Sequence, residues 1–178
     1  MSEGGPTGPS VRSQAVEVCR VDPSQWQVHR SVRLAMLLDT PLAFGSTFAR
    51  EVALTGEQWR ARMRDSTSWL ASQGDLPLGS VTLYRFPEQA ADEAHLVAMW
   101  VAAHARGRGV ADALVLALLD HCREAGLRRV TLDVAVDNAR ATSFYRRMGF
   151  VPTGRTGVLP HSPEVAELEL ERLTGPSR

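Results

Sequence analysis

The feature that most constrains the fold is the alternation of strands and helices in the second half of the chain. An apolar run at 95–101 is typical of a strand that is buried on both faces of a sheet. A glycine-rich turn leads into 110–125, where apolar residues recur at helical spacing until Gly126 ends the helix. A second strand at 129–136 and a second helix at 138–148 follow. This order predicts a sheet with a crossover connection and helices packed against it.

The first part of the chain predicts one strand and two helical regions. The alternation at 15–21 indicates the strand, and Asp22-Pro23-Ser24-Gln25 has the residues that begin a helix. That helix is expected to end at Asp39-Thr40-Pro41, because the residue before a proline disfavours the helical conformation. The apolar stripe that it should bury consists of Val28, Val32, Ala35 and Leu38. A second helical region covers 48–64 and restarts at the capping sequence Thr55-Gly56-Glu57-Gln58.

Two further pairs of strands complete the predicted sheet. Strands at 68–73 and 79–86 are joined by Gly74-Asp75-Leu76-Pro77, a turn-rich link that indicates a hairpin. Strands at 150–155 and 165–172 close the chain across a loop that contains two prolines.

The length of 178 residues predicts one domain with a loose segment. Gly, Pro and Ser are frequent at 1–14, which is expected to be a flexible leader. A single domain should occupy 15–174, and 175–178 should form a short tail. No stretch approaches 18 apolar residues, so no membrane partner is expected.

The charge composition excludes several classes of function. Every basic residue is arginine, so a P-loop lysine and a Schiff-base lysine are both absent. The 20 basic and 20 acidic residues balance, and no nucleic-acid partner is expected. Cys19 and Cys122 have no metal-site spacing, so we expect no metal, no disulfide framework and a reducing cytoplasmic setting. Cys122 also falls on the apolar stripe of its helix, which favours a core role over a nucleophile.

The segment Arg106-Gly107-Arg108-Gly109-Val110-Ala111 carries the strongest functional signal. It lies where a helix begins, and the free N–H groups and positive dipole end of a helix can bind an anion through backbone alone. The two glycines let a phosphate approach the chain, and the two arginines add charge-assisted contacts. The dinucleotide fingerprint fails, because Asp112 stands where its third glycine is required.

Two motifs resemble those of the GNAT family of N-acetyltransferases. The segment 106–111 is similar to the family's pyrophosphate loop, Arg/Gln-x-x-Gly-x-Gly/Ala. Downstream, Asn138, Ala141 and Tyr145 stand at the spacing of the family's Asn-x-x-Ala-x-x-x-Tyr signature, and Gly149-Phe150 follows. The resemblance covers 79–154 well, whereas the N-terminal helices match in pattern alone.

This resemblance implies a fold, a reaction and a set of binding residues. The fold would be mixed α/β, with a central, largely antiparallel sheet of six to seven strands flanked by about four helices. The reaction would be direct transfer of acetyl from acetyl-CoA to a primary amine of a small-molecule or peptide acceptor. The residues expected to bind acetyl-CoA are Trp100, Val101, Arg106, Gly107, Arg108, Gly109, Val110, Ala111, Asn138 and Tyr145.

Several residues are candidates for the acid and the base. In proteins similar to this chain, a tyrosine at the position of Tyr145 faces the cofactor sulfur, which would make it the acid for the leaving thiolate. The alternative is a tyrosine that only packs in the core. Asp133 lies among apolar residues on a strand, where burial would raise its proton affinity, so it is a candidate base. A structural Asp133 is the alternative, and Glu51, Glu93 and His95 stay open as bases, directly or through water.

The acceptor pocket is expected from 41–51 and 157–164. The residues expected to shape it are Phe44, Phe48 and Trp59 as apolar walls, with Glu51 and Glu164 to attract a cationic amine. The acceptor's identity stays open. A catalytically inactive acyl-CoA sensor or interaction module with the same fold is the alternative function. A homodimer also stays open, because no interface stripe identifies one.

Overall fold

The computed structural model describes residues 15–160 and 162–175. The strands are β1 (Glu17–Arg20), β2 (Ser66–Gln73), β3 (Leu76–Tyr84), β4 (Glu93–Val101), β5 (Arg129–Ala135), β6 (Val151–Leu159) and β7 (Ser162–Leu173). They form one seven-stranded sheet in the order β1-β2-β3-β4-β5-β7-β6. Only β4 and β5 pair in parallel, across the crossover that the sequence predicted. The mixed, largely antiparallel sheet is thereby confirmed, whereas the leader at 1–14 and the tail residues 176–178 lie outside the described residues.

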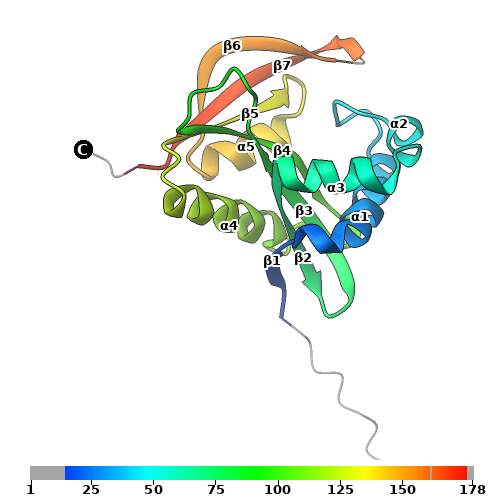
Figure 1. Ribbon diagram of the computed structural model, residues 1–178. Coiled ribbons are helices and arrows are strands. Elements are labelled where there is room, and N and C mark those ends of the chain that lie inside the picture. Colours follow the sequence, from blue (N-terminus) through cyan, green and yellow to red (C-terminus); the bar gives the residue numbers. More distant parts are fainter. Residues whose placement is uncertain (1–14, 161, 176–178) are drawn as a thin grey trace, which may run out of the picture.

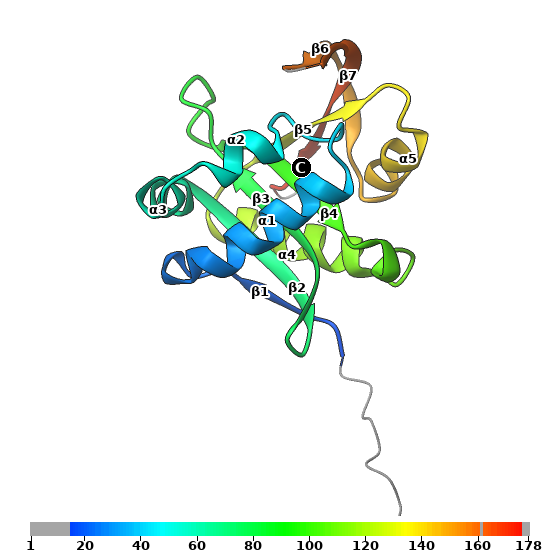
Figure 2. The same ribbon diagram turned by 90° about the vertical axis from the view of Figure 1, so that its right-hand side faces the viewer.

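Helices cover both faces of this sheet (Figure 1). They are α1 (Trp26–Asp39), α2 (Phe48–Val52), α3 (Gly56–Asp65), α4 (Val110–Glu124) and α5 (Ala139–Arg147), with 3-10 turns η1 (Pro23–Gln25) and η2 (Ala103–Ala105). Figure 2 shows α1 crossing in front of the central strands, with α4 behind them. The described part has one α-helix more than the four expected, because the helical region at 48–64 splits at the predicted restart, where Thr55 and Gln58 form a capping box.

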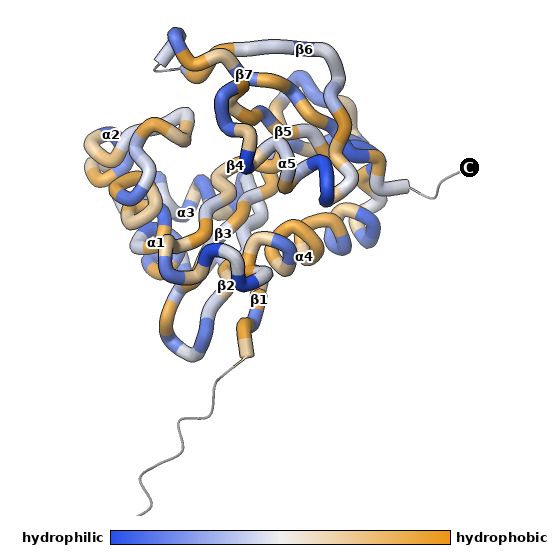
Figure 3. Tube along the Cα trace, turned by 180° about the vertical axis from the view of Figure 1, so that it is seen from behind, coloured by the Kyte–Doolittle hydropathy of each residue, from blue (hydrophilic) through white to orange (hydrophobic). Residues whose placement is uncertain are grey.

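The main core lies between α4, α5 and the sheet. Hydrophobic positions dominate α4 and the strands beside it (Figure 3). Leu114, Leu118 and Cys122 of α4 are fully buried against β2 and β3, as their spacing predicted. Tyr145 and Phe150 extend this cluster to α5. Each large apolar side chain buried here contributes about 1.5–3 kcal/mol, so this layer holds α4 and α5 firmly on one face.

The buried face of α1 differs from the predicted one. Of the four predicted residues only Val32 is buried, and Val28, Ala35 and Leu38 are exposed. The residues that α1 buries are Val32, Arg33, Met36 and Leu37. Arg33 can occupy this buried face because Glu51 of α2 accepts hydrogen bonds from its guanidinium. The prediction counted only apolar residues and therefore placed the buried stripe wrongly.

Turn and strand ends also differ from the expected bounds. The β2–β3 turn is Gly74-Asp75, because Leu76 and Pro77 already pair with the end of β2. The last two strands are longer than 150–155 and 165–172. The two loop prolines had suggested a wider loop, but Pro160 lies in the turn and Pro163 lies near the start of β7, before the pairing of β7 with β5 begins at Glu167. The missing N–H of Pro163 therefore interrupts no ladder with β5.

Strands β4 and β5 separate part of the way along their length. They pair over three registers only, from Glu93 opposite Arg129 to His95 opposite Thr131. Beyond this point β4 carries a bulge against β3, and Ala98 has a φ of 55°. Residues 97–101 are half-buried, so the expectation of a strand buried on both faces holds only for its first half. The separation opens the middle of the sheet.

Among the described residues, no helix is both long and apolar enough to cross a membrane.

Candidate active site

Two cavities open beside the separated end of β4. The first, which we call the α4 cavity, has a volume of about 660 Å³ and lies between the start of α4, α5 and the end of β4. All residues predicted to bind the cofactor line it except Arg108. The second, the α1 cavity, has a volume of about 570 Å³ and lies between α1, α2 and α3 and the sheet. Phe44 lines both, so the two cavities adjoin.

The start of α4 is built to receive an anion through its backbone. Gly107 and Gly109 have φ values of 77° and 79°, and a Cβ at either position would have no neighbour within 4 Å. Gly109 is the N-cap of α4 and provides no side-chain hydrogen bond to the first turn. The N–H groups of that turn therefore have no capping side chain, and they face open space at the positive end of the helix dipole. This geometry fits the pyrophosphate of a nucleotide cofactor.

Arg106 is committed to the protein rather than free for a ligand. Its Nε donates to the carbonyl of Val101 at 3.0 Å, and its Nη2 lies 2.7 Å from Asp39 Oδ2. The indole Nε1 of Trp100 donates to the same carboxylate oxygen at 2.9 Å. Asp39, at the end of α1, thus ties the cofactor loop to the opposite helical layer. Sequence reasoning missed Asp39. The available signal was its place at the C-terminus of a helix, where the helix dipole disfavours a carboxylate unless a cationic partner is near.

The other charged side chains around the α4 cavity differ in whether they form an ion pair within the protein. Asp112, in the first turn of α4, forms an ion pair with Arg147 of α5. The hydrogen bond from Arg147 lowers the pKa of Asp112, so its negative charge is offset beside the anion site. Arg140 also lines the cavity, and no ion pair involves it among residues 15–160 and 162–175. Arg108 is likewise without an ion pair there, but it lies outside the cavity wall.

Helix α5 places Asn138 and Tyr145 on the same cavity. The Oδ1 of Asn138 accepts a hydrogen bond from the N–H of Ala141 at 3.0 Å, so this residue both caps the helix and lines the cavity. Tyr145 is 6% exposed and packs edge-on against Phe144 and Phe150. Burial raises the pKa of Tyr145, so the phenol keeps its proton at neutral pH and can donate it.

Glu51 lies on the α1 cavity within a buried group of charges. The guanidinium of Arg33 binds it in a bidentate manner, with distances of 3.0 and 2.8 Å, and Arg62 Nη1 lies 3.0 Å from its Oε2. Glu51 is 1% exposed. Burial opposes its ionisation, but the Arg33 hydrogen bonds and both positive charges outweigh this, and the pKa of Glu51 is lowered. This pairing favours a positioning role over that of a proton acceptor.

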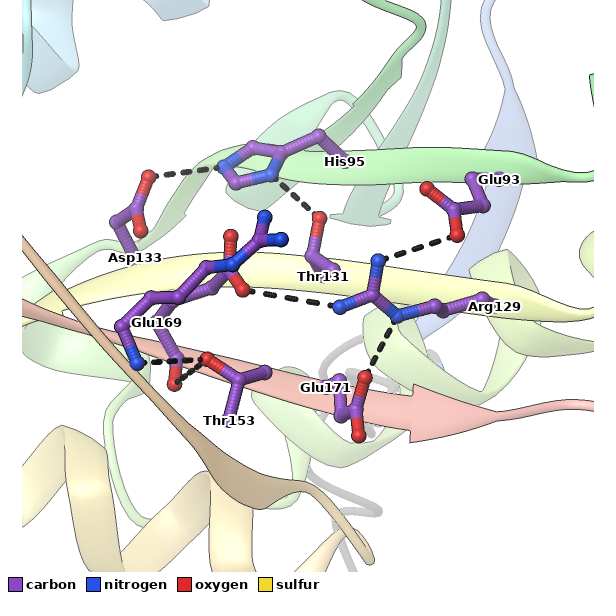
Figure 4. A network of polar contacts seen from close by, with 9 residues as sticks. Glu93, His95, Arg129, Thr131, Asp133, Thr153, Glu169 and Glu171 are labelled. Carbon is purple, nitrogen blue, oxygen red and sulfur yellow. Dashed lines mark hydrogen bonds and ion pairs between the residues drawn. The ribbon is translucent and has the colours of Figure 1, made fainter. Parts of the chain in front are cut away.

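Asp133 is 43% exposed on its side chain, so its predicted burial is wrong. The strands separate at this point, which opens the position to solvent. Its Oδ2 lies 3.3 Å from His95 Nε2, while His95 Nδ1 lies 2.7 Å from Thr131 Oγ1 (Figure 4). His95 is buried, and its ring packs against Phe86, which lines the α1 cavity. The sequence had separated Asp133 and His95 as rival bases, whereas the structure joins them. Neither residue lines either cavity, and Phe86 is the link from His95 to the α1 cavity.

Glu93 belongs to a different polar network. It lies 3.1 Å from Arg129, which also contacts Glu169 and Glu171 of β7 (Figure 4). Glu93 stands at the start of β4 and lines neither cavity. The half-buried Glu167, which precedes these two glutamates on β7, has a raised pKa, caused first by burial and then by the charge of Asp133. Sequence reasoning missed Glu167, although the alternation of glutamates along β7 marks one polar face.

The remaining predicted residues lie away from the cavities. Trp59 is fully buried beneath Arg62, Phe48 packs on Met36 and Leu37, and Glu164 is exposed on β7. Burial raises the pKa of Cys122 to about 12, so its thiol is unreactive at neutral pH. No group of three His, Cys, Asp or Glu within 15–160 and 162–175 is arranged to hold a metal ion.

The comparisons with known proteins agree with this geometry. The chain is 31% identical over 148 residues to a mycothiol acetyltransferase of Beutenbergia cavernae, covering 66% of this chain and 49% of that protein. It is 31% identical over 94 residues to N-acetyltransferase 8B of Rattus norvegicus, covering 52% and 42%. The chain therefore spans about half or less of these relatives.

Solved structures extend the likeness to nearly the whole chain. A GCN5-related N-acetyltransferase from Kribbella flavida is similar with a TM-score of 0.68 and 25% identity, covering 89% of this chain and 98% of that one. A GNAT acetyltransferase from Streptococcus pneumoniae has the same fold, with a TM-score of 0.73 and 17% identity over 90% and 100%. Residues 34–150, which are more than half of the chain, match the model described as the acetyltransferase (GNAT) family. The chain belongs to the GNAT family of acetyltransferases.

Proposed function

We propose that this chain is an acetyl-CoA-dependent N-acetyltransferase that transfers acetyl directly to a primary amine. The observation that carries the proposal is the junction of the two cavities at Phe44 and the β4 bulge. Val97 and Ala98 line the α1 cavity, and the next three residues of β4 line the α4 cavity. A donor in one cavity and an amine in the other would meet at this point.

The backbone at the start of α4 would hold the pyrophosphate, and the unpaired side of β4 would offer N–H groups to the acyl arm. Trp100 and Val101 line the cavity on that strand, and Asn138 lies opposite on α5. When bound, acetyl-CoA supplies the activated acetyl thioester. Tyr145 offers its phenolic proton within the same cavity and is the proposed acid for the departing sulfur.

Asp133 with its partner His95 is the proposed proton acceptor. The pair stands where β4 and β5 separate, and Phe86 connects His95 to the wall of the α1 cavity. Because Asp133 is exposed, water can carry the proton of the amine to the pair. Glu51 is engaged by two arginines and Glu93 by Arg129, so both are proposed as supports rather than bases.

The experiment that tests the function measures release of free CoA from acetyl-CoA over a panel of amines. Transfer predicts release that depends on the amine and yields an acetylated product by mass spectrometry. Binding of acetyl-CoA with no release over any amine would favour the inactive module instead.

A variant pair tests the assignment of the base. Asp133→Asn should lower turnover by about 10² or more, because the amide cannot accept a proton, while acetyl-CoA affinity is retained. Glu93→Gln is the matched control on the neighbouring strand and should leave turnover unchanged. Equal rates for the Asp133 variant and the native protein across the pH range would remove Asp133 from the mechanism.

A further inference from the structure

The α1 cavity has more positive than negative charge in its wall. Arg33, Arg50 and Arg62 line it, and the only carboxylates in the part of the wall that the structure describes are Glu51 and Asp65. This arrangement contradicts the expectation that Glu51 attracts a cationic amine. Its carboxylate is already bound by two guanidinium groups, so no negative charge is left over for a ligand.

Arg33 and Arg62 together carry one positive charge more than their shared partner Glu51 neutralises. Arg33 is 7% exposed and makes both of its strong hydrogen bonds to Glu51. Its Nη1 contacts the sulfur of Met36 at 3.7 Å, a weak acceptor. One carboxylate cannot neutralise two guanidinium groups, and the side chain of Arg62 is 42% exposed and lines the cavity. An anion that enters the cavity therefore meets a net positive charge.

The titration of a neighbouring histidine agrees with a positive potential. His29 lines the same cavity and packs against Trp59. Burial, followed by the charges of Arg62 and Arg33, lowers the pKa of His29 to about 4. His29 is therefore neutral at physiological pH and adds no further positive charge.

The surplus charge also lies close to the proposed reaction centre. The guanidinium of Arg33 stacks over the ring of Phe44 at 5.4 Å, and Phe44 is the residue shared by both cavities. An anionic group held by Arg33 and Arg62 would thus be near an amine at the junction. The volume of about 570 Å³ suits a small molecule, and Met36, Phe44, Phe86 and Val97 give it apolar walls.

We infer that the acceptor is a small amine that also carries a carboxylate, as an amino acid with an apolar side chain does, and that Arg33 and Arg62 bind this carboxylate. The Nε and Nη2 of Arg33 already bind Glu51, so the contacts to the substrate carboxylate come from the Nη1 of Arg33 and from Arg62, which Glu51 engages through Nη1. Charge-assisted hydrogen bonds from two guanidinium groups give orientation as well as affinity. The inference rests on the proposed function, since it names the class of acceptor for the same site.

The test compares probes that share a body and differ at one group. Phenylalanine, phenylalaninamide and 2-phenylethylamine are offered as acceptors in the CoA-release assay. The expected kcat/KM for phenylalanine exceeds that for the amide by about 10- to 100-fold, the usual worth of a charged hydrogen-bonded contact. The intrinsic reactivity of the two amines favours the opposite order, because the amine of phenylalaninamide loses its proton more readily than the amine of phenylalanine. Equal or faster use of the amide and the plain amine would overturn the inference.

A matched pair of variants on α3 assigns the effect to Arg62. Arg62→Gln leaves the Arg33–Glu51 pair in place and should reduce the preference for acid over amide at least tenfold. Arg60→Gln, on the same helix, removes an exposed arginine that stacks on Trp26 and lines neither cavity, and should leave the preference unchanged. A loss of rate in Arg62→Gln that is equal for all three acceptors would contradict the assignment.

A binding measurement separates this inference from the catalytic proposal. With CoA present, N-acetylphenylalanine should raise the melting temperature of the native protein more than N-acetylphenylalaninamide does, and Arg62→Gln should abolish the difference. No difference would overturn the inference even if other amines are acetylated. A clear difference without CoA release from any amine would instead refute the catalytic proposal and leave the carboxylate site standing.

Discussion

The two cavities of this molecule are built in different ways. The wall of the α4 cavity depends on backbone: two glycines with positive φ, an uncapped helix start and a strand with one unpaired side. The wall of the α1 cavity depends on side chains brought together from three helices, with a buried carboxylate between two arginines. One cavity is therefore specified by short local motifs, and the other by residues that meet only in the folded chain.

The largest expected effect falls on the chemistry in the α4 cavity. Tyr145→Phe keeps the ring between Phe144 and Phe150 and removes only the hydroxyl. The rate of acetyl transfer should fall by about 10² to 10⁴, the range for a lost general acid. Single-turnover rates, acetyl-CoA affinity and melting temperature are measured on the same variant. Full activity in a normally melting protein would remove Tyr145 from the mechanism.

The second effect falls on stability at the α1 cavity. Glu51→Gln leaves Arg33 buried without its counter-ion and should lower the free energy of unfolding by about 3–5 kcal/mol. Glu93→Gln is the control, because Arg129 retains Glu169 and Glu171, and it should cost about 1 kcal/mol or less. Urea unfolding measures both. Similar losses in the two variants would mean that the wall of the α1 cavity does not depend on this charge group.

The third effect is on binding at the cofactor loop. Gly109→Asp places a negative charge and a Cβ where the backbone should meet pyrophosphate, and acetyl-CoA affinity should fall about 10- to 100-fold. Gly126→Asp is the matched control at the other end of α4, since its φ of 71° and its open surroundings impose the same backbone strain. If both variants lose affinity equally, strain rather than the anion site explains the result.

The smallest effect concerns the buried thiol. Because the pKa of Cys122 is raised to about 12, its thiol stays protonated at pH 8, and only the exposed Cys19 should react with a thiol reagent before unfolding. Cys122→Ala should keep the native transfer rate per folded molecule, as direct transfer requires. A loss of transfer in a folded Cys122→Ala protein would point to an acetyl-cysteine intermediate instead.

Nine of the ten residues that the sequence grouped as a cofactor site line the α4 cavity, because the features that mark them are local. Gly107 and Gly109 directly precede α4, and Asn138 and Tyr145 belong to one helix, as the N-cap of α5 and a residue near its end. Strand and helix order also followed from local patterns of apolar, capping and turn residues. Asp39 escaped notice, since its partners Trp100 and Arg106 are 61 and 67 residues away.

The α1 cavity could not be predicted in the same way. Arg33, Glu51 and Arg62 stand on three helices, and none of them belongs to a motif. A signal was nevertheless present, because Arg33 shares a helical face with Met36 and Leu37 and so had to be buried. The wrong prediction that Asp133 is buried has the same cause. Its exposure depends on the separation of β4 from β5, which the residues of β5 do not indicate by themselves.

The most direct measurement is a calorimetric titration of the native protein with acetyl-CoA. The geometry at the start of α4 predicts one saturable site with a dissociation constant between about 1 μM and 1 mM, the range of substrate affinities that is usual for enzymes. Gly126→Asp should bind like the native protein, and Gly109→Asp should bind more weakly. No detectable binding at millimolar acetyl-CoA, in protein shown to be folded, would contradict the assignment of this cavity and with it the proposed function.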